Sequence, residues 1–242
     1  MRKVIKTLFV ACSVTFSVFL CNAPAVASET LSARFGNTTL KLPYPSKLCV
    51  LGRSAGENTI WDQQKMIQTQ TNNKLLAMWL DCGSKRKLQN GESTDLKEWV
   101  IVVGHLSGTS KAERVFPEFD RDQYVKEMTK VLPNLAFDEI WEEVDRAIEK
   151  ANEVYLGDKS AVTIDDPINL GILAVEDAAY MGVIMNIGTK LDRKPVAGIF
   201  SSTLIKGVPI SHYSYKYYRG KKTVSDLLSK SKYYNAKIIF SN

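Results

Sequence analysis

Few side chains in this sequence could carry out acid–base or nucleophilic chemistry. The chain has two histidines, His105 and His212. A catalytic nucleophile usually needs a histidine base beside it, but His105 lies in Gly104–Gly108 (GHLSG), which lacks the Gly-x-Ser-x-Gly pattern of a nucleophile elbow. We therefore expect ordinary structural roles, with His105 at the end of a strand and His212 in the middle of one.

Carboxylates offer a second kind of chemistry. Asp81, Glu98 and Asp177 lie near the ends of predicted strands, and two carboxylates from distant parts of a chain can cleave a glycosidic bond. A small hydrolase or cell-wall-acting enzyme is therefore one hypothesis, although no motif identifies its catalytic residues. The chain has no dinucleotide fingerprint, no phosphate-binding loop and no His-Glu-x-x-His, so it predicts neither a cofactor nor a metal site.

Tyrosines near the carboxyl end could bind a ligand by stacking. Tyr213, Tyr215 and Tyr217 alternate along a predicted strand and would share one face of a sheet, while Tyr218 follows directly. Such a face is usually core, but it can also stack on a sugar or a peptide. A carrier of a small ligand is therefore another hypothesis, and an apolar cavity in the structure would favour it.

The amino terminus has the pattern of a cleavable secretory signal. Three basic residues in the first six precede the apolar run Thr7–Leu20, and Ala25–Ala27 (AVA) matches a signal-peptidase site. The run of about fourteen residues is shorter than the roughly twenty that span a bilayer. We expect residues 1–27 to be a signal peptide and the mature protein to be periplasmic or secreted, with no transmembrane segment. A lipid anchor on Cys21 is the alternative.

Two cysteines remain once the leader is removed, Cys49 and Cys82. An even number of cysteines in an oxidising compartment favours one disulfide, and two separate buried thiols are the alternative. Two thiols cannot form a zinc site of several thiolates, and the chain has no Cys-x-x-Cys redox motif.

Basic residues concentrate towards the carboxyl end. Between Lys206 and Lys237 there are eight Lys and Arg and a single acid, Asp226, whereas the stretch Asp138–Glu153 is strongly acidic. An exported protein rarely meets nucleic acid, so we expect an anionic envelope component or an acidic protein as partner. A lysine-rich surface that only solvates the fold is the alternative. The candidate partner-binding residues are Lys216, Arg219, Lys221, Lys222, Lys230 and Lys232.

The elements that would position these residues form an α+β pattern. Apolar runs at Lys74–Asp81 and Glu98–His105 are typical of buried strands, and the polar stretch Gly83–Thr94 between them is typical of a turn. Asn58 or Thr59 can cap a helix before the first of these strands. We expect residues 28–242 to form a single α+β domain with a mostly antiparallel sheet and helices packed on its faces.

A helical segment is predicted at about residues 120–156. Asp120 or Asp122 can cap a first helix that Pro133 ends. Apolar residues at three- and four-residue spacing then predict an amphipathic helix over Phe137–Tyr155.

Strands and a closing helix follow this segment. Two short strands are predicted within 161–175, and two longer ones follow at Ala179–Ile187 and Val196–Ile205. The pair Lys206-Gly207 predicts a two-residue hairpin turn, which would place Phe200 opposite Tyr213 and Ser201 opposite His212. A last helix is expected to open at Thr223 or Ser225.

Three segments resemble a group of exported proteobacterial proteins with a PsbP-like α/β sandwich. They are Leu42–Pro45 (LPYP) with Cys49–Leu51 (CVL), Leu80–Cys82 (LDC), and the hairpin Leu204–Ser211 (LIKGVPIS). The resemblance implies an antiparallel sheet with helices on its faces, supports pairing of Cys49 with Cys82, and favours a non-enzymatic role. The resemblance and the segregated charge together give the leading hypothesis. It is an exported protein that binds a macromolecule through its basic region.

Overall fold

The computed structural model describes residues 29–242, with gaps at 93–94, 109, 135, 157–161 and 190–191. The predicted signal peptide, residues 1–27, lies outside the described residues. Within the part that is described, no helix is long and apolar enough to cross a membrane.

Seven strands form one sheet in the order β3-β4-β5-β9-β8-β7-β6, and every neighbouring pair is antiparallel. A separate hairpin of β1 and β2 forms a second sheet. The strands are β1 (Thr30–Phe35), β2 (Thr38–Pro43), β3 (Leu48–Val50), β4 (Asn73–Asp81), β5 (Glu98–His105), β6 (Thr163–Val175), β7 (Ala179–Gly188), β8 (Arg193–Ile205) and β9 (Val208–Tyr217).

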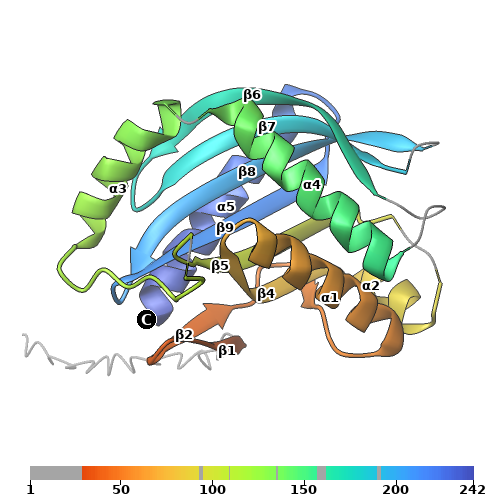
Figure 1. The fold of residues 1–242 in the computed structure, drawn as a ribbon, viewed down its shortest axis with the longest axis horizontal. Helices are drawn as coiled ribbons and strands as arrows, with labels where there is room; N and C mark the ends of the chain where they lie inside the picture. Colours follow the sequence, from red (N-terminus) through yellow and green to blue (C-terminus); the bar gives the residue numbers. More distant parts are fainter. Residues whose placement is uncertain (1–28, 93–94, 109, 135, 157–161, 190–191) are drawn as a thin grey trace, which may run out of the picture.

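Helices cover both faces of the large sheet (Figure 1). They are α1 (Ala55–Gln70), α2 (Cys82–Gln89), α3 (Arg121–Val131), α4 (Phe137–Tyr155) and α5 (Lys221–Ser241), with a 3₁₀ turn at Leu132–Asn134. In Figure 1, α1, α3 and α4 lie on the near side of the sheet and α5 lies on the far side. This arrangement confirms the predicted α+β fold, and the helical segment predicted at about 120–156 corresponds to α3, the 3₁₀ turn and α4.

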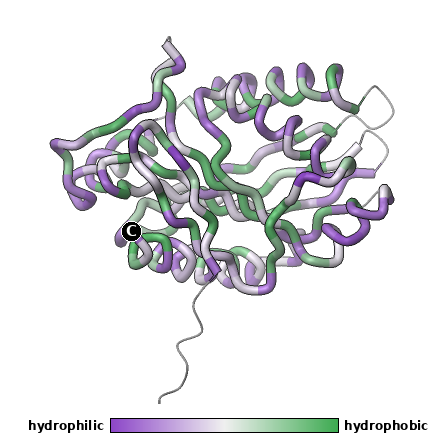
Figure 2. The backbone as a smooth tube through the Cα atoms, turned by 90° about the horizontal axis from the view of Figure 1, so that it is seen from below, coloured by the Kyte–Doolittle hydropathy of each residue, from purple (hydrophilic) through white to green (hydrophobic). Residues whose placement is uncertain are grey.

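The face under α5 and the β1–β2 hairpin is closely packed, and we call it the filled face. Phe35 from β1, Trp79 from β4, Val102 from β5 and Ile210 from β9 are each at most 1 % exposed. Trp79 makes edge contacts with Tyr234 of α5 at 5.8 Å between ring centroids. Hydrophilic and hydrophobic stretches alternate along the helices that surround the sheet (Figure 2). This core anchors the sheet.

The opposite face is covered by α1 and α4, which pack on each other, and we call it the hollow face. Ile67 of α1 contacts Ala147 and Ala151 of α4 in a small apolar cluster. Beside this cluster, the buried side chain of Gln63 donates a hydrogen bond to Asn152 Oδ1 at 3.1 Å. The two helices therefore form a paired roof over the sheet.

The predicted hairpin at Lys206-Gly207 is confirmed in every register position. Phe200 is opposite Tyr213, Ser201 is opposite His212, and Val196 is opposite Tyr217. Lys206 and Gly207 have φ of 51° and 75°, as a tight two-residue hairpin turn requires.

Two predictions about helices were wrong. The helix expected to open at Asn58 or Thr59 begins at Ala55, because Ser54 and Glu57 form a capping box in which the backbone N–H of Ser54 donates to the Glu57 carboxylate at 3.2 Å. The stretch Gly83–Thr94, expected to be a turn, contains α2. Asp81 starts this helix by accepting a hydrogen bond from the backbone N–H of Ser84 at 3.0 Å.

Two further boundaries differ from the sequence prediction. The two short strands expected within 161–175 are one strand, β6, which has register irregularities and positive φ at Asp166 and Gly171. Helix α5 begins at Lys221 behind Gly220, two residues before the predicted Thr223.

A disulfide joins Cys49 of β3 to Cys82 at the first position of α2, with 5.0 Å between the Cα atoms. The predicted pairing is therefore confirmed, and the alternative of separate thiols is excluded. Leu88 of α2 packs very closely against Gly56 of α1, because a Cβ at position 56 would clash with the carbonyl oxygen of Leu88. By holding α2 in place, the disulfide therefore also fixes the start of α1 in the roof.

Candidate functional site

A cavity of about 1320 Å³ lies between the hollow face of the sheet and the roof formed by α1 and α4. Strand β5 runs along it from Trp99 to His105, a length of roughly 20 Å at the rise of an antiparallel strand. The volume exceeds the range of about 300–1,000 Å³ in which most small-molecule sites fall.

Aromatic side chains line the middle of the cavity. Trp99 and Tyr215 stack with 4.9 Å between ring centroids, and Phe200 contacts both Tyr213 at 5.3 Å and Tyr215 at 5.9 Å. Trp141 of α4 faces Phe200 from the roof at 6.4 Å. Loss of solvent contact in these apolar surroundings raises the pKa of Tyr213 and Tyr215 well above the usual value, so both phenols stay neutral.

These rings pack against the core of this face on one side and border the cavity on the other. Phe200, Tyr213 and Tyr215 lie in the interior of a seven-stranded sheet, where side chains are normally buried, yet each is only half-buried. The partial exposure arises because α1 and α4 pack on each other above the sheet and leave the space beneath them unfilled.

One end of the cavity, which we call the polar end, carries hydrogen-bonding groups. His105 Nε2 and Ser211 Oγ are 2.7 Å apart. Ser202 lies opposite Ser211 on the neighbouring strand. The Oγ of Ser202 is 3.0 Å from the hydroxyl oxygen of Tyr124 on α3. Both serines are buried and line the cavity, so two hydroxyls and an imidazole meet at one end of it.

Arg114 supplies a positive charge to the polar end. The backbone N–H of Arg114 donates to the carbonyl of His105 at 3.1 Å, and Arg114, which is exposed, is one of the residues that line the cavity. Desolvation and the nearby charge of Arg114 lower the pKa of His105 to about 4, so His105 is neutral at pH 7. Among the described residues, the guanidinium of Arg114 forms no ion pair and no hydrogen bond.

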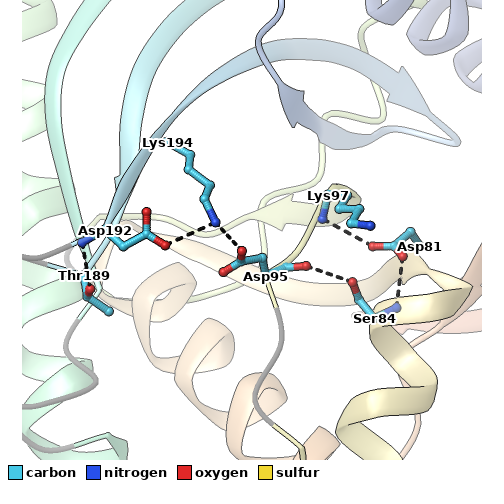
Figure 3. A network of polar contacts seen from close by, with 7 residues as sticks. All are labelled: Asp81, Ser84, Asp95, Lys97, Thr189, Asp192 and Lys194. Atoms are coloured by element: carbon cyan, nitrogen blue, oxygen red, sulfur yellow. Dashed lines mark hydrogen bonds and ion pairs between the residues drawn. The ribbon is translucent and has the colours of Figure 1, made fainter.

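The other end, which we call the latch end, is closed by ion pairs. Lys194 of β8 reaches between Asp95, which precedes β5, and Asp192, which precedes β8 (Figure 3). The backbone carbonyl of Asp95 also accepts a hydrogen bond from Ser84 Oγ of α2 at 2.9 Å. These contacts connect α2 to the start of β8, and the carboxylates raise the pKa of Lys194.

The carboxylates considered for hydrolysis do not meet at the cavity. Asp81 caps α2 and also accepts from the backbone N–H of Lys97 at 3.3 Å. Glu98 forms ion pairs with Lys216 and Lys230 on the α5 side. Asp177 lies at the connection between β6 and β7, where its carbonyl accepts from Thr203 at 2.6 Å. None of the three carboxylates is part of the described lining.

Most of the predicted partner-binding residues are engaged within the protein. Lys216 and Lys230 both contact Glu98, at 3.1 and 2.5 Å. Lys232 contacts Glu176 at 2.5 Å, and Lys222 contacts Asp226 one turn away at 3.3 Å. The remaining two, Arg219 and Lys221, are exposed near the start of α5. The basic region is thus partly neutralised by its own fold.

His212 and Tyr218 do not belong to the cavity. His212 faces α5, is 1 % exposed, and its Nδ1 is 2.6 Å from Ser201 Oγ. Burial lowers the pKa of His212 to about 3. Tyr218 packs beside Leu227 in a different apolar cluster. No group of three or more His, Cys, Asp or Glu side chains in the described part of the chain could hold a metal ion.

The sequence prediction identified the aromatic face but missed most of the cavity. It did not single out Arg114, Ser202, Ser211 or the roof helix α1. A signal was present in the strands, because Ser202 and Ser211 are polar residues at positions that face inwards. The turn predicted over 206–207 already places these two serines opposite each other.

Comparison with known protein families finds no family model that matches the chain, and comparison with curated proteins finds no detectable relative. Neither result bears on the resemblance to PsbP-like proteins, which stays a prediction.

Proposed function

We propose that this protein binds a small, largely apolar molecule in the cavity between its sheet and the α1–α4 roof, and that it works as a ligand carrier. The observation that carries the proposal is the 1320 Å³ cavity lined by half-buried aromatic rings. Large apolar cavities with a few convergent polar groups are the typical form of ligand sites. Aromatic rings such as Phe200 and Tyr215 provide large contact areas for an apolar ligand.

The binding of a macromolecule through the basic region stays a prediction with weaker support. Three of its six candidate residues are occupied by Glu98 and Glu176. Reversing the charge of Lys230 or Lys232 would therefore break the fold's own ion pairs. A sharper test replaces only Arg219 and Lys221 with glutamine and compares the captured partners of the two forms after crosslinking.

The hydrolase hypothesis has one observation in its favour, the contact between His105 and Ser211 in the cavity. A general base acts best when its pKa is near the working pH, whereas the pKa of His105 is lowered to about 4. No carboxylate among the described residues hydrogen-bonds to His105 to orient it. A binding role for this pair therefore has more support than a catalytic one.

We also propose that the protein acts in the periplasm or outside the cell. The Cys49–Cys82 disulfide supports this location, because disulfides persist mainly in oxidising compartments. The basic and apolar pattern of residues 1–20 supports it independently.

The test of the proposed function is the binding of N-phenyl-1-naphthylamine, an uncharged dye that fluoresces in apolar sites. The variant Val144→Phe fills the cavity from α4, and we expect it to weaken binding at least tenfold. Val154→Phe is the matched control, since Val154 is on the same helix but is 58 % exposed and outside the lining. Equal binding by both variants, or no binding by the wild type, would contradict the proposal.

A further inference from the structure

The two ends of the cavity differ in charge. At the latch end, three acids (Glu92, Asp95 and Asp192) and two lysines (Lys87 and Lys194) line the cavity, which leaves a net charge of −1. At the polar end, Arg114 is the charged lining residue and His105 is neutral at pH 7. The remaining acid of the lining, Glu143, is exposed on α4.

The charge of Arg114 is not neutralised by its neighbours. Glu113, the adjacent carboxylate, contacts Lys74 at 2.5 Å, so it is engaged elsewhere. The position of Arg114 is fixed by its backbone bond to His105 and by the bridge between Leu106 and Glu113. Arg114 is exposed and its guanidinium has no partner among the described residues, so it is free to form charge-assisted hydrogen bonds with an anion.

Uncharged hydrogen-bonding groups stand beside Arg114. Asn73 lies opposite His105 in the sheet, lines the cavity and is 8 % exposed. Its amide nitrogen donates to the carbonyl of Thr71 at 2.9 Å, while its buried Oδ1 receives no hydrogen bond from any described residue. Because Oδ1 of Asn73 can only accept, the uncharged groups here that can donate to an anionic head group are the hydroxyls of Ser202 and Ser211.

We propose that the ligand is an amphipathic organic anion, with one carboxylate at the polar end against Arg114 and an apolar body along the aromatic middle. The charge at each end gives the ligand a direction, since its carboxylate is attracted to Arg114 and repelled by the acids near Asp95. The distance from His105 to Trp99, roughly 20 Å along β5, accommodates an extended chain of about twelve to fourteen carbons. This inference rests on the proposed function.

The experiment measures how well three molecules with the same twelve-carbon chain displace N-phenyl-1-naphthylamine from the intact protein. They are dodecanoate, dodecanol and dodecyltrimethylammonium, each used below its micellar concentration at pH 7.5. We expect dodecanoate to displace the dye at a concentration at least tenfold lower than dodecanol, and the cation to be the weakest competitor. A factor of ten corresponds to about 1.4 kcal/mol, close to the lower limit for one hydrogen bond to a charged group.

The variant Arg114→Gln is expected to reduce the preference for dodecanoate over dodecanol to less than threefold. Arg219→Gln is the matched control, because Arg219 is exposed and outside the lining, and it should keep the full preference. Equal displacement by all three molecules, or a preference that survives in Arg114→Gln, would overturn the proposed anion while leaving a cavity that binds the dye. Failure of the wild type to bind the dye or any chain would overturn the proposed function as well.

Discussion

The two faces of the seven-stranded sheet are built from the same strands but are used differently. On the filled face, α5 and the β1–β2 hairpin press directly on side chains such as Trp79 and Val102, which are 0 % exposed. On the hollow face, α1 and α4 pack on each other as well as on the sheet. Side chains such as Met78 and Ile101 are buried there, but rings such as Phe200 and Tyr215 remain half-buried beside the cavity.

This difference assigns stability mainly to the filled face and ligand binding to the hollow face. Close packing provides most of the stabilisation that a core can give, because each empty volume forfeits contacts. A hollow face contributes less, and it persists only where other interactions hold its roof in place. In this protein those interactions are the Gln63–Asn152 hydrogen bond, the disulfide and the Lys194 ion pairs. We expect mutations on the two faces to have different consequences.

The largest difference is expected for two tryptophans. Trp79→Ala on the filled face should lower the free energy of unfolding by about 3–5 kcal/mol, because it leaves a large cavity in a packed core. Trp141→Ala on the hollow face should cost about 1–2 kcal/mol, since the half-buried ring already borders open space. Urea denaturation followed by circular dichroism measures both values. Similar losses for the two variants would show that the faces do not differ in packing.

The disulfide is expected to have the next largest effect. Its loop of 33 residues gives a stabilisation of about 3–4 kcal/mol from reduced chain entropy. The double variant Cys49→Ala with Cys82→Ala should lose about this amount and should also bind the dye more weakly, because α2 supports the roof. If the variant loses stability without any change in dye binding, the disulfide does not hold the hollow face.

A pH effect is expected from the filled face. The pKa of His212 is lowered by burial to about 3 from an unfolded value near 6.5, and the ring faces two uncharged groups, Ser201 and Tyr234. Protons therefore bind more readily to the unfolded chain, so the stabilisation is complete above pH 6.5 and is lost as the pH falls towards 3. Between pH 7.5 and pH 4.5 the loss should be about 2–3 kcal/mol.

The control for this effect is His212→Gln, which cannot titrate in that range. The difference in unfolding free energy between the wild type and this variant should shrink by about 2–3 kcal/mol over the same interval. Carboxylates and His105 titrate in both proteins and cancel in the comparison. A difference that stays constant with pH would mean that His212 is not held neutral by burial.

The strands of the sheet were more predictable from sequence than the cavity above them. Apolar runs identified β4 and β5, and the turn at Lys206-Gly207 gave the correct register of β8 and β9. These features depend on local periodicity and on turn chemistry, which a sequence contains. Helix α2 was missed because it is short and polar, so its composition resembles that of a turn. The signal for its start is a single capping residue, Asp81.

The cavity could not be predicted because it depends on the distance between elements. Alternation identified Tyr213 and Tyr215 as inward-facing, but a residue that faces a core and one that faces a cavity have the same pattern. The distinction is set by α1 and α4, whose contact through Ile67 and Ala147 joins residues 80 positions apart in the chain. Arg114 lies between elements, where no periodicity applies.

The smallest expected effect provides the most direct test of the comparison. Val102→Phe adds a ring to the filled face, where no space is available, and should cost about 1–3 kcal/mol. The same substitution at Val144 places the ring in the cavity and should change the unfolding free energy by less than about 0.5 kcal/mol, because the added atoms gain contacts without displacing any. Equal costs at the two positions, measured by urea denaturation, would mean that the space under the roof closes in solution. In that case the weakened dye binding expected of Val144→Phe would reflect a disturbed fold, and the argument for a ligand site would fail with it.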